Sequence, residues 1–110
     1  MNDINELLNL FLVSNPIRGN SWLENDFIRV YVRRSRRLLN NVNFSCIDIA
    51  NVIVNEKYLK QHIFKNFILF CESLDNVYVE SVLNPELENM LIKNNYTRHE
   101  IHTSSFYKLK

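Results

Sequence analysis

The stretch from Asn43 to Leu74 runs from a predicted strand into a predicted helix with no spacer between them. Residues 43–54 carry apolar side chains on both faces, which is typical of a central strand covered on both sides. A further strand is predicted at 77–82, so the three segments form a βαβ crossover whose two strands are parallel. The turn into the helix falls near Asn55. Because the first N–H groups of a helix are unpaired, such a turn favours a bound anion such as a phosphate.

The segments before this crossover predict a helix and a strand. Residues 3–13 carry apolar side chains at helical spacing behind Asp3, which suits an N-cap. Residues 15–25 are predicted to be a loop. Residues 26–39 alternate between polar and apolar side chains and lead through the turn at Asn40-Asn41 into the strand at 43–54. The two strands are therefore expected to form a hairpin.

The segments after the crossover predict one more helix and one more strand. Asn84-Pro85 combines an N-cap residue with a proline at the first helical position, so a helix begins there. Residues 101–109 are expected to return as a strand. The predicted order is α-β-β-α-β-α-β, an α/β (α+β) fold with a mixed sheet flanked by helices. A chain of 110 residues has room for one core, so residues 1–110 are expected to form a single domain.

Composition narrows the class of protein. The chain is 46% hydrophobic and 23% charged, as in folded globular domains, and its net charge of +1 points to no particular partner. No apolar run reaches the roughly 20 residues that span a bilayer, and the acidic start MNDINELLNL lacks the basic region of a signal peptide. Cys46 and Cys71 lie in apolar segments and are expected to be reduced thiols of a cytoplasmic protein. Abundant asparagine with a single glycine suggests an AT-rich genome, as in some viruses and low-GC bacteria.

Three segments carry a resemblance to a known family. The first is IDIANVIVNEKY with the apolar helix after it, the second is VYVESVLNPELENML, and the third is IKNNY followed by SSFYKL. Together they resemble the GNAT superfamily of N-acyltransferases, and more narrowly its small phage-type members. The resemblance covers roughly residues 26–109. It implies an acyl-CoA N-acyltransferase-like fold in which the first segment holds acetyl-CoA, and no metal is expected.

The family's pyrophosphate loop follows the pattern Q/R-x-x-G-x-G/A, which aligns with residues 59–64. Leu59 stands where Arg or Gln is usual, His62 where Gly is usual, and Phe64 where Gly or Ala is usual. Glycine at the fourth position lets backbone N–H groups lie against the phosphates, whereas a histidine side chain tends to occupy the ligand's space. The resemblance implies cofactor contacts at Ile53, Val54, Lys60, Gln61, His62, Ile63, Phe64 and Asn84.

The sequence offers few candidates for a catalytic acid or base. The family often places a tyrosine acid on the helix that begins at Asn84, and the matching position is Leu91. Asp48 and Glu80 are the candidate general bases for an amine substrate, although each also suits a charge on a sheet face or edge. His99 and His102 are three residues apart in a segment expected to be extended, which places them on opposite faces and argues against a shared metal.

Five arginines crowd the predicted strand at 26–39. A solvated edge strand protected by charge would explain them. They would equally suit an anion site for nucleic acid, for an acidic patch on a protein partner, or for the adenosine phosphate of coenzyme A. The five residues are Arg29, Arg33, Arg34, Arg36 and Arg37.

Two functional hypotheses follow from the residues and the resemblance. In the first, the chain is a degenerate GNAT-like protein that binds or inhibits a macromolecule, a host macromolecule if the source is viral, and does not catalyse transfer. In the second, it is an acetyl-CoA-dependent N-acetyltransferase that acts on a protein or small-molecule amine. A protein partner is expected, nucleic acid is an alternative partner through the arginines, a membrane is not expected, and free sheet edges would allow a dimer.

Overall fold

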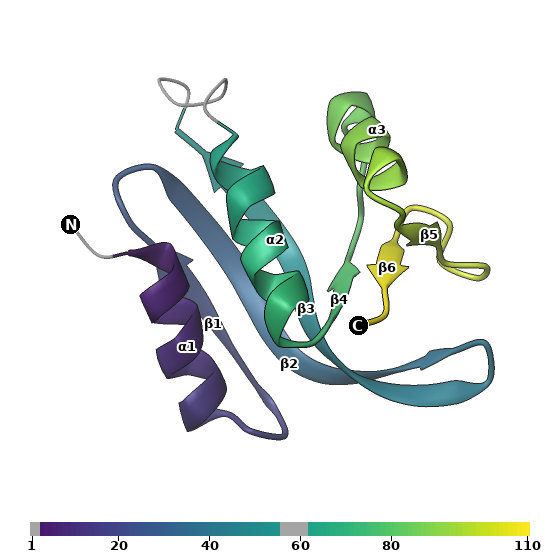
Figure 1. The fold of residues 1–110 in the computed structure, drawn as a ribbon, viewed down its shortest axis with the longest axis horizontal. Helices are drawn as coiled ribbons and strands as arrows, with labels where there is room; N and C mark the ends of the chain where they lie inside the picture. The colour runs from purple at the N-terminus through teal and green to yellow at the C-terminus, as the bar shows by residue number, and fades with distance from the viewer. Residues whose placement is uncertain (1–2, 56–61) are drawn as a thin grey trace.

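The computed structural model describes residues 3–55 and 62–110. Six strands form one mixed sheet in the order β1-β2-β3-β4-β6-β5, with α1 and α2 side by side on one face (Figure 1). Only the β3–β4 pair is parallel. The elements are α1 Ile4–Ser14, β1 Gly19–Glu24, β2 Ile28–Leu39, β3 Val42–Val54, α2 Ile63–Leu74, β4 Asn76–Val79, α3 Pro85–Lys93, β5 Thr97–Arg98 and β6 Phe106–Lys108.

Local signals in the sequence set the ends of these elements. The Asp3 carboxylate accepts a hydrogen bond from the Asn5 N–H at 2.9 Å and caps α1. Asn40 and Asn41 both have positive φ, 52° and 64°, which gives the tight left-handed turn that a two-residue hairpin needs. The Asn84 side chain accepts from the Glu86 N–H at 2.8 Å and caps α3, with proline next in the chain. The predicted hairpin and both predicted caps are confirmed.

The β3–α2–β4 crossover is confirmed as the centre of the fold. Cys46–Ile49 pairs in parallel with Asn76–Val79, and α2 returns across the face between them. Helix α2 begins at Ile63, directly after His62, and so starts later than the predicted turn near Asn55; residues 56–61 lie outside the described residues.

The two faces of the sheet are buried in different ways. On one face, side chains of α1, α2 and α3 pack with alternate residues of the strands in the main core, which includes Leu8, Phe67 and Leu91. On the other face, a smaller cluster consists of Leu39, Cys46, Tyr78 and Tyr107 with Phe44 against it, and no helix contributes to that cluster. We expected β3 to be covered on both sides. Its second face is instead buried near Cys46 by side chains of the sheet itself, while Asn51 and Ile53 further along β3 are exposed.

Three expectations about the strands are wrong in detail. The predicted loop at 15–25 contains β1, which pairs with β2 from Gly19↔Arg34 to Glu24↔Arg29. The arginine-rich β2 is therefore an interior strand and not an edge. The predicted last strand at 101–109 is shorter, Phe106–Lys108, and pairs with the two-residue β5. The fold class is as expected, with two short strands more than the predicted order contained.

No helix among residues 3–55 and 62–110 is long and apolar enough to cross a membrane.

We expect Leu8→Ala to destabilise the protein by about 2–5 kcal/mol, because Leu8 is fully buried between α1 and the sheet and its removal leaves a cavity. Leu10→Ala on the same helix is the matched control, since Leu10 is 65% exposed, and should change stability by less than about 0.5 kcal/mol. Urea denaturation followed by circular dichroism measures both. Similar losses in the two variants would contradict this placement of α1.

Candidate functional site

The two parallel strands at the centre of the sheet separate after a short pairing. The last hydrogen bond between them runs from the Glu80 N–H to the Ile49 carbonyl at 3.0 Å. At that point β3 carries a bulge, because Tyr31 pairs with Asn51 and Val32 pairs with Ile49, leaving Ala50 as the extra residue. Such a bulge bends the strand that carries it. Beyond the bulge, β3 continues beside β2, while the chain after β4 turns away. The edge of β3 that faces β4 is therefore not paired with any described strand after Ile49.

A groove occupies this opening. It consists of two adjoining cavities of about 270 and 290 Å³, which share Val52, Asn84 and Leu87. Together these volumes suit a small molecule or the narrow arm of a larger one. We call this the β3–β4 groove. Its remaining lining residues are Ile49, Ala50, Asn51, Val54, His62, Ile63, Phe64, Lys65, Val79, Glu80, Ser81, Leu83, Glu86 and Met90.

The start of α2 opens onto this groove. His62 immediately precedes the helix with φ 54° and ψ 30°, and its side chain makes no capping hydrogen bond. A left-handed backbone is natural for glycine and uncommon for other residues, although histidine is enriched among the exceptions. The backbone at His62 therefore has a conformation that suits the glycine expected there, while the position carries an imidazole. Leu59, Lys60 and Gln61 lie outside the described residues.

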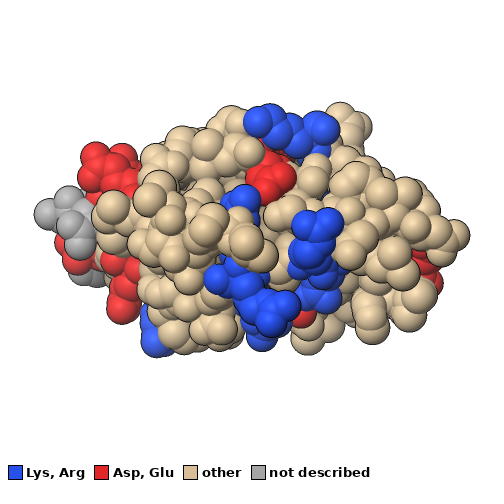
Figure 2. All heavy atoms as spheres, turned by 90° about the horizontal axis from the view of Figure 1, so that it is seen from below, with Lys and Arg blue, Asp and Glu red and all other residues tan. Residues whose placement is uncertain are grey.

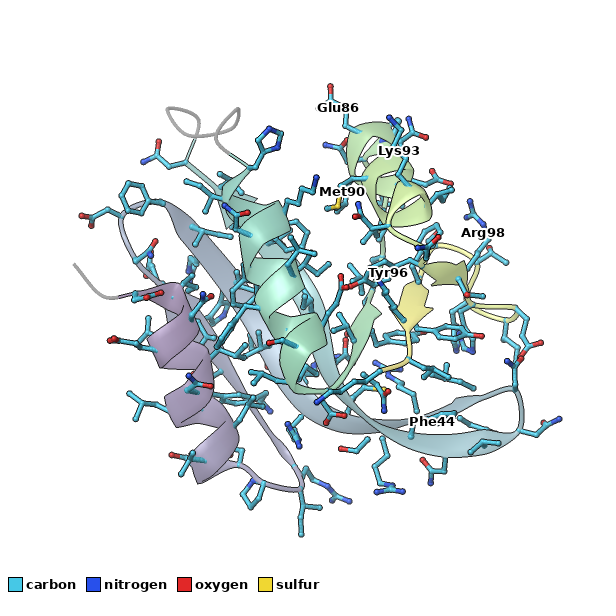
Figure 3. All side chains as sticks on the ribbon, in the orientation of Figure 1. Phe44, Glu86, Met90, Lys93, Tyr96 and Arg98 are labelled. Carbon is cyan, nitrogen blue, oxygen red and sulfur yellow. The ribbon has the colours of Figure 1, made fainter. Side chains whose placement is uncertain are left out.

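The structure brings together most of the expected cofactor positions. Val54, His62, Ile63, Phe64 and Asn84 all line the groove, whereas Ile53 does not and is half-exposed. Figure 3 shows Met90 on the side of α3 that faces α2, with Glu86 at the start of α3. Sequence reasoning did not select Lys65, since its place in the groove arises only when β3, α2 and α3 meet. Leu91, at the expected tyrosine position, is fully buried in the core.

The two candidate bases belong to one ion-pair network on the helix-free face of the sheet. Asp48 of β3 is fully buried and pairs with the Arg37 guanidinium. Arg37 also lies 3.2 Å from one carboxylate oxygen of Glu80, and Arg33 donates to the other oxygen at 2.9 Å. The Arg37 guanidinium sits over the Tyr78 ring, 4.3 Å from its centroid. This network joins β2, β3 and the end of β4.

The network perturbs the titration of its members. Burial raises the pKa of Asp48 to about 6, because the loss of hydration outweighs the hydrogen bond and charge of Arg37. Burial alone would lower the pKa of Arg37, but the hydrogen bond and charge of Asp48 reverse this and raise it. Asp48 lines none of the described cavities. Glu80 borders the groove, but both of its oxygens are committed to arginines.

A third cavity of about 350 Å³ lies beyond this network, lined by Arg37, Tyr78, Glu80, Ser81 and residues 102–105. Beside it the Tyr78 hydroxyl and the His99 Nδ1 lie 3.0 Å apart. The His99 and His102 rings are 5.1 Å apart, so our expectation that they lie on opposite faces of a strand is wrong, because the chain turns there. Burial and the charge of His102 lower the pKa of His99. The described residues contain no group of three His, Cys, Asp or Glu placed to hold a metal.

Most of the arginine cluster is tied to nearby groups. Arg29 lies over the Trp22 ring at 4.0 Å from its centroid, and Arg34 pairs with Asp75 at 3.2 Å. Arg33 and Arg37 belong to the network described above. Arg36 is exposed and has no ion pair among the described residues.

No protein-family model and no curated protein matches this sequence. Three solved structures are similar to it, and each likeness covers 94% of this chain. They are the KacTA–DNA complex (TM-score 0.63, 11% identity, 79% of that chain), AtaT complexed with acetyl-methionyl-tRNAfMet (0.65, 11%, 82%), and a mutant AtaT toxin bound to the C-terminus of the antitoxin AtaR and acetyl-CoA (0.59, 13%, 79%). Identities this low show the fold alone. The mixed sheet with its flanking helices is the GNAT-like fold that the sequence resemblance implied.

We expect the buried Asp48 to make stability depend on pH. Its pKa of about 6 in the fold exceeds the value of roughly 4 in an unfolded chain, so its protonation stabilises the fold. This contribution is complete below about pH 4 and is lost as the pH rises through about 6. We compare the free energy of unfolding of the unmodified protein with that of the Asp48→Asn variant at each pH. The difference between them should fall by about 1–3 kcal/mol between pH 4 and 7. Urea denaturation at each pH measures it, and a constant difference would contradict the raised pKa.

Proposed function

We propose that this protein is a GNAT-like domain that holds an acyl-CoA in the β3–β4 groove and acts by binding rather than by acyl transfer. The observation that carries the proposal is that Glu80 is already paired with two arginines. It is the carboxylate that borders the groove at the strand opening, and both of its oxygens are held by Arg33 and Arg37.

The shape and backbone of the groove support a bound acyl-CoA. After Ile49, the edge of β3 that faces β4 has no strand partner among the described residues. Its peptide groups are therefore available to the amide groups of a pantetheine arm. Val52, Leu87 and Met90 supply apolar walls. The N-terminus of α2 borders the same groove and favours the negative charge of a pyrophosphate. One similar structure, of AtaT, contains acetyl-CoA.

The acid–base residues selected from the sequence argue against transfer by this chain. A base must be free to take a proton from the amine, and an acid must be free to protonate the leaving thiolate. Asp48 is fully buried against Arg37, and Leu91 stands where the family often has tyrosine. A carboxylate that bridges two guanidiniums would have to give up an ion pair before accepting a proton. We therefore infer that the protein binds the acyl-CoA without transferring its acyl group. Its function on this proposal is to contact a protein or nucleic-acid partner.

Calorimetry with acetyl-CoA tests the binding proposal. We expect saturable binding by the unmodified protein and a loss of at least tenfold in affinity for Leu87→Trp, because Leu87 lines both halves of the groove. Ile92→Trp on the same helix is the control, since Ile92 is about half exposed and lines neither half, and it should bind as the unmodified protein does. Circular dichroism verifies that both variants are folded. Absence of binding at millimolar acetyl-CoA would refute the proposal.

A second candidate function is acetyl transfer to an α-amino group. AtaT has been solved with acetyl-methionyl-tRNAfMet, and an α-amine has a pKa of roughly 7.7–8.0, so roughly a tenth of it is uncharged at pH 7 and ready to attack. Such an amine needs no general base. Its nitrogen would attack the thioester carbonyl carbon, the C–S bond would break, and the amine proton would pass through solvent to the thiolate. The departures from the family's motifs do not prevent this reaction, provided that the groove holds the thioester.

Mass spectrometry separates the two candidates. The protein is incubated with acetyl-CoA and either methionyl-tRNA or a peptide with a free N-terminus. Our first proposal predicts acetyl-CoA binding without N-acetylated product above the uncatalysed level. Acetylated product that disappears in Leu87→Trp and persists in Ile92→Trp would replace the first proposal with the second.

A further inference from the structure

A separate concave surface lies on the β1–β2 hairpin. Its cavity, of about 400 Å³, is formed by the start of β1 and the middle of β2 and is lined by four arginines. We call it the arginine cavity. It shares no lining residue with the β3–β4 groove. In Figure 2, Lys and Arg side chains gather across the middle of the face seen from below, the side on which β1 begins. The lining residues are Ile17, Arg18, Gly19, Asn20, Arg33, Arg34, Ser35 and Arg36.

The arginine cavity has an excess of positive charge. Arg33 pairs with Glu80 at 2.9 Å and Arg34 with Asp75 at 3.2 Å. Arg18 and Arg36 are exposed, and neither makes an ion pair among residues 3–55 and 62–110. The Nε of Arg34 is buried without a hydrogen-bond acceptor. Guanidinium groups bind phosphate through paired N–H donors, so the cavity suits a phosphate group.

Aromatic side chains lie next to this cavity on the helix-free face. Trp22 and Tyr31 are directly opposite on β1 and β2, with ring centroids 5.1 Å apart, and Trp22 is 39% exposed. Arg33 lies over the Tyr31 ring at 5.4 Å from its centroid and also lines the arginine cavity. Because Asn20 pairs with Arg33 and Trp22 with Tyr31, these four side chains share one face of the hairpin. Arg34 and Arg36 alternate to the other face of β2, so the cavity surrounds the start of β1 and adjoins the rings through Asn20 and Arg33.

We propose that this surface of the β1–β2 hairpin binds single-stranded nucleic acid. Its phosphates occupy the arginine cavity, and unpaired bases stack on Trp22 and Tyr31. The combination of a basic groove with exposed aromatic rings on a sheet is how proteins hold unpaired strands. A duplex offers no free base faces to the rings, and an acidic peptide gains little from them. The site is independent of the acyl-CoA groove in its residues, so it stands even if the proposed function fails.

Fluorescence anisotropy with labelled oligo(U) and oligo(dT) twelve-mers tests the proposal. The double variant Arg18→Ala/Arg36→Ala removes two guanidiniums that maintain no internal ion pair. We expect it to lose at least tenfold in affinity at low salt. The slope of log K against log salt should fall by about 1.4, since each phosphate contact to a single strand contributes roughly 0.7.

Two controls locate the binding site. Lys93→Ala removes an exposed charge at the far end of α3 (Figure 3) and should leave affinity within twofold. Trp22 is the sole tryptophan, so stacking of a base on it should quench the intrinsic emission of the protein. The single variants Arg18→Ala and Arg36→Ala should each show an intermediate loss.

Several outcomes would overturn the proposal. They are unchanged affinity in the double variant, unchanged Trp22 emission at saturating oligonucleotide, or tighter binding of polyglutamate or of a duplex than of the single strand. Calorimetry with acetyl-CoA on the double variant keeps the two proposals apart. It should bind acetyl-CoA as the unmodified protein does, because neither arginine lines the groove.

Discussion

The buried carboxylate of Asp48 is the constraint on which the rest of the structure depends. A fully buried charge must be paired, and removal of one partner of such a pair typically costs about 3–5 kcal/mol. Arg37 supplies that partner from β2, and Glu80, directly after β4, completes the pairing of Arg37. The network therefore ties three neighbouring strands together at the level where β3 and β4 begin to separate. The position of the groove follows from it, because the strands are held on one side of this point and free on the other.

The same network includes a carboxylate that borders the groove. Glu80 is close enough to the opening to meet a substrate, but its two oxygens hold Arg33 and Arg37 in place. Arg33 in turn borders the arginine cavity on the opposite side. Glu80 lines the β3–β4 groove and Arg33 lines the arginine cavity. Among the residues that the structure describes, theirs is the one ion pair that directly joins these two surfaces. A carboxylate in this position maintains the geometry of the site, and this structural role competes with service as a general base.

Much of the fold could be predicted because its signals are local. The asparagine turn at 40–41, the cap at Asn84 and the apolar strand–helix–strand run each specify their own conformation. Strand β1 gave no such signal, since Leu23 is its one buried residue and the segment shows no apolar alternation. The site was only partly predictable for a related reason. Arg33 and Glu80 are 47 residues apart, so nothing in the sequence near either residue indicates that they pair. The arginines were expected either to protect an edge strand or to bind an anion, and most of them instead make ion pairs or ring contacts within the fold.

The features that the chain retains and those that it lacks belong to different parts of the peptide. The strand opening, the bulge at Ala50 and the left-handed backbone at His62 are all properties of the main chain. The departures from the family pattern, at positions 59, 62, 64 and 91, are changes of side chain. Ligand contacts made by peptide groups tolerate changes of side chain, provided that the new side chains leave room. Proton transfer needs a particular side chain. At 11–13% identity to the solved structures that it resembles, this chain shares their fold through its backbone while most of its side chains differ.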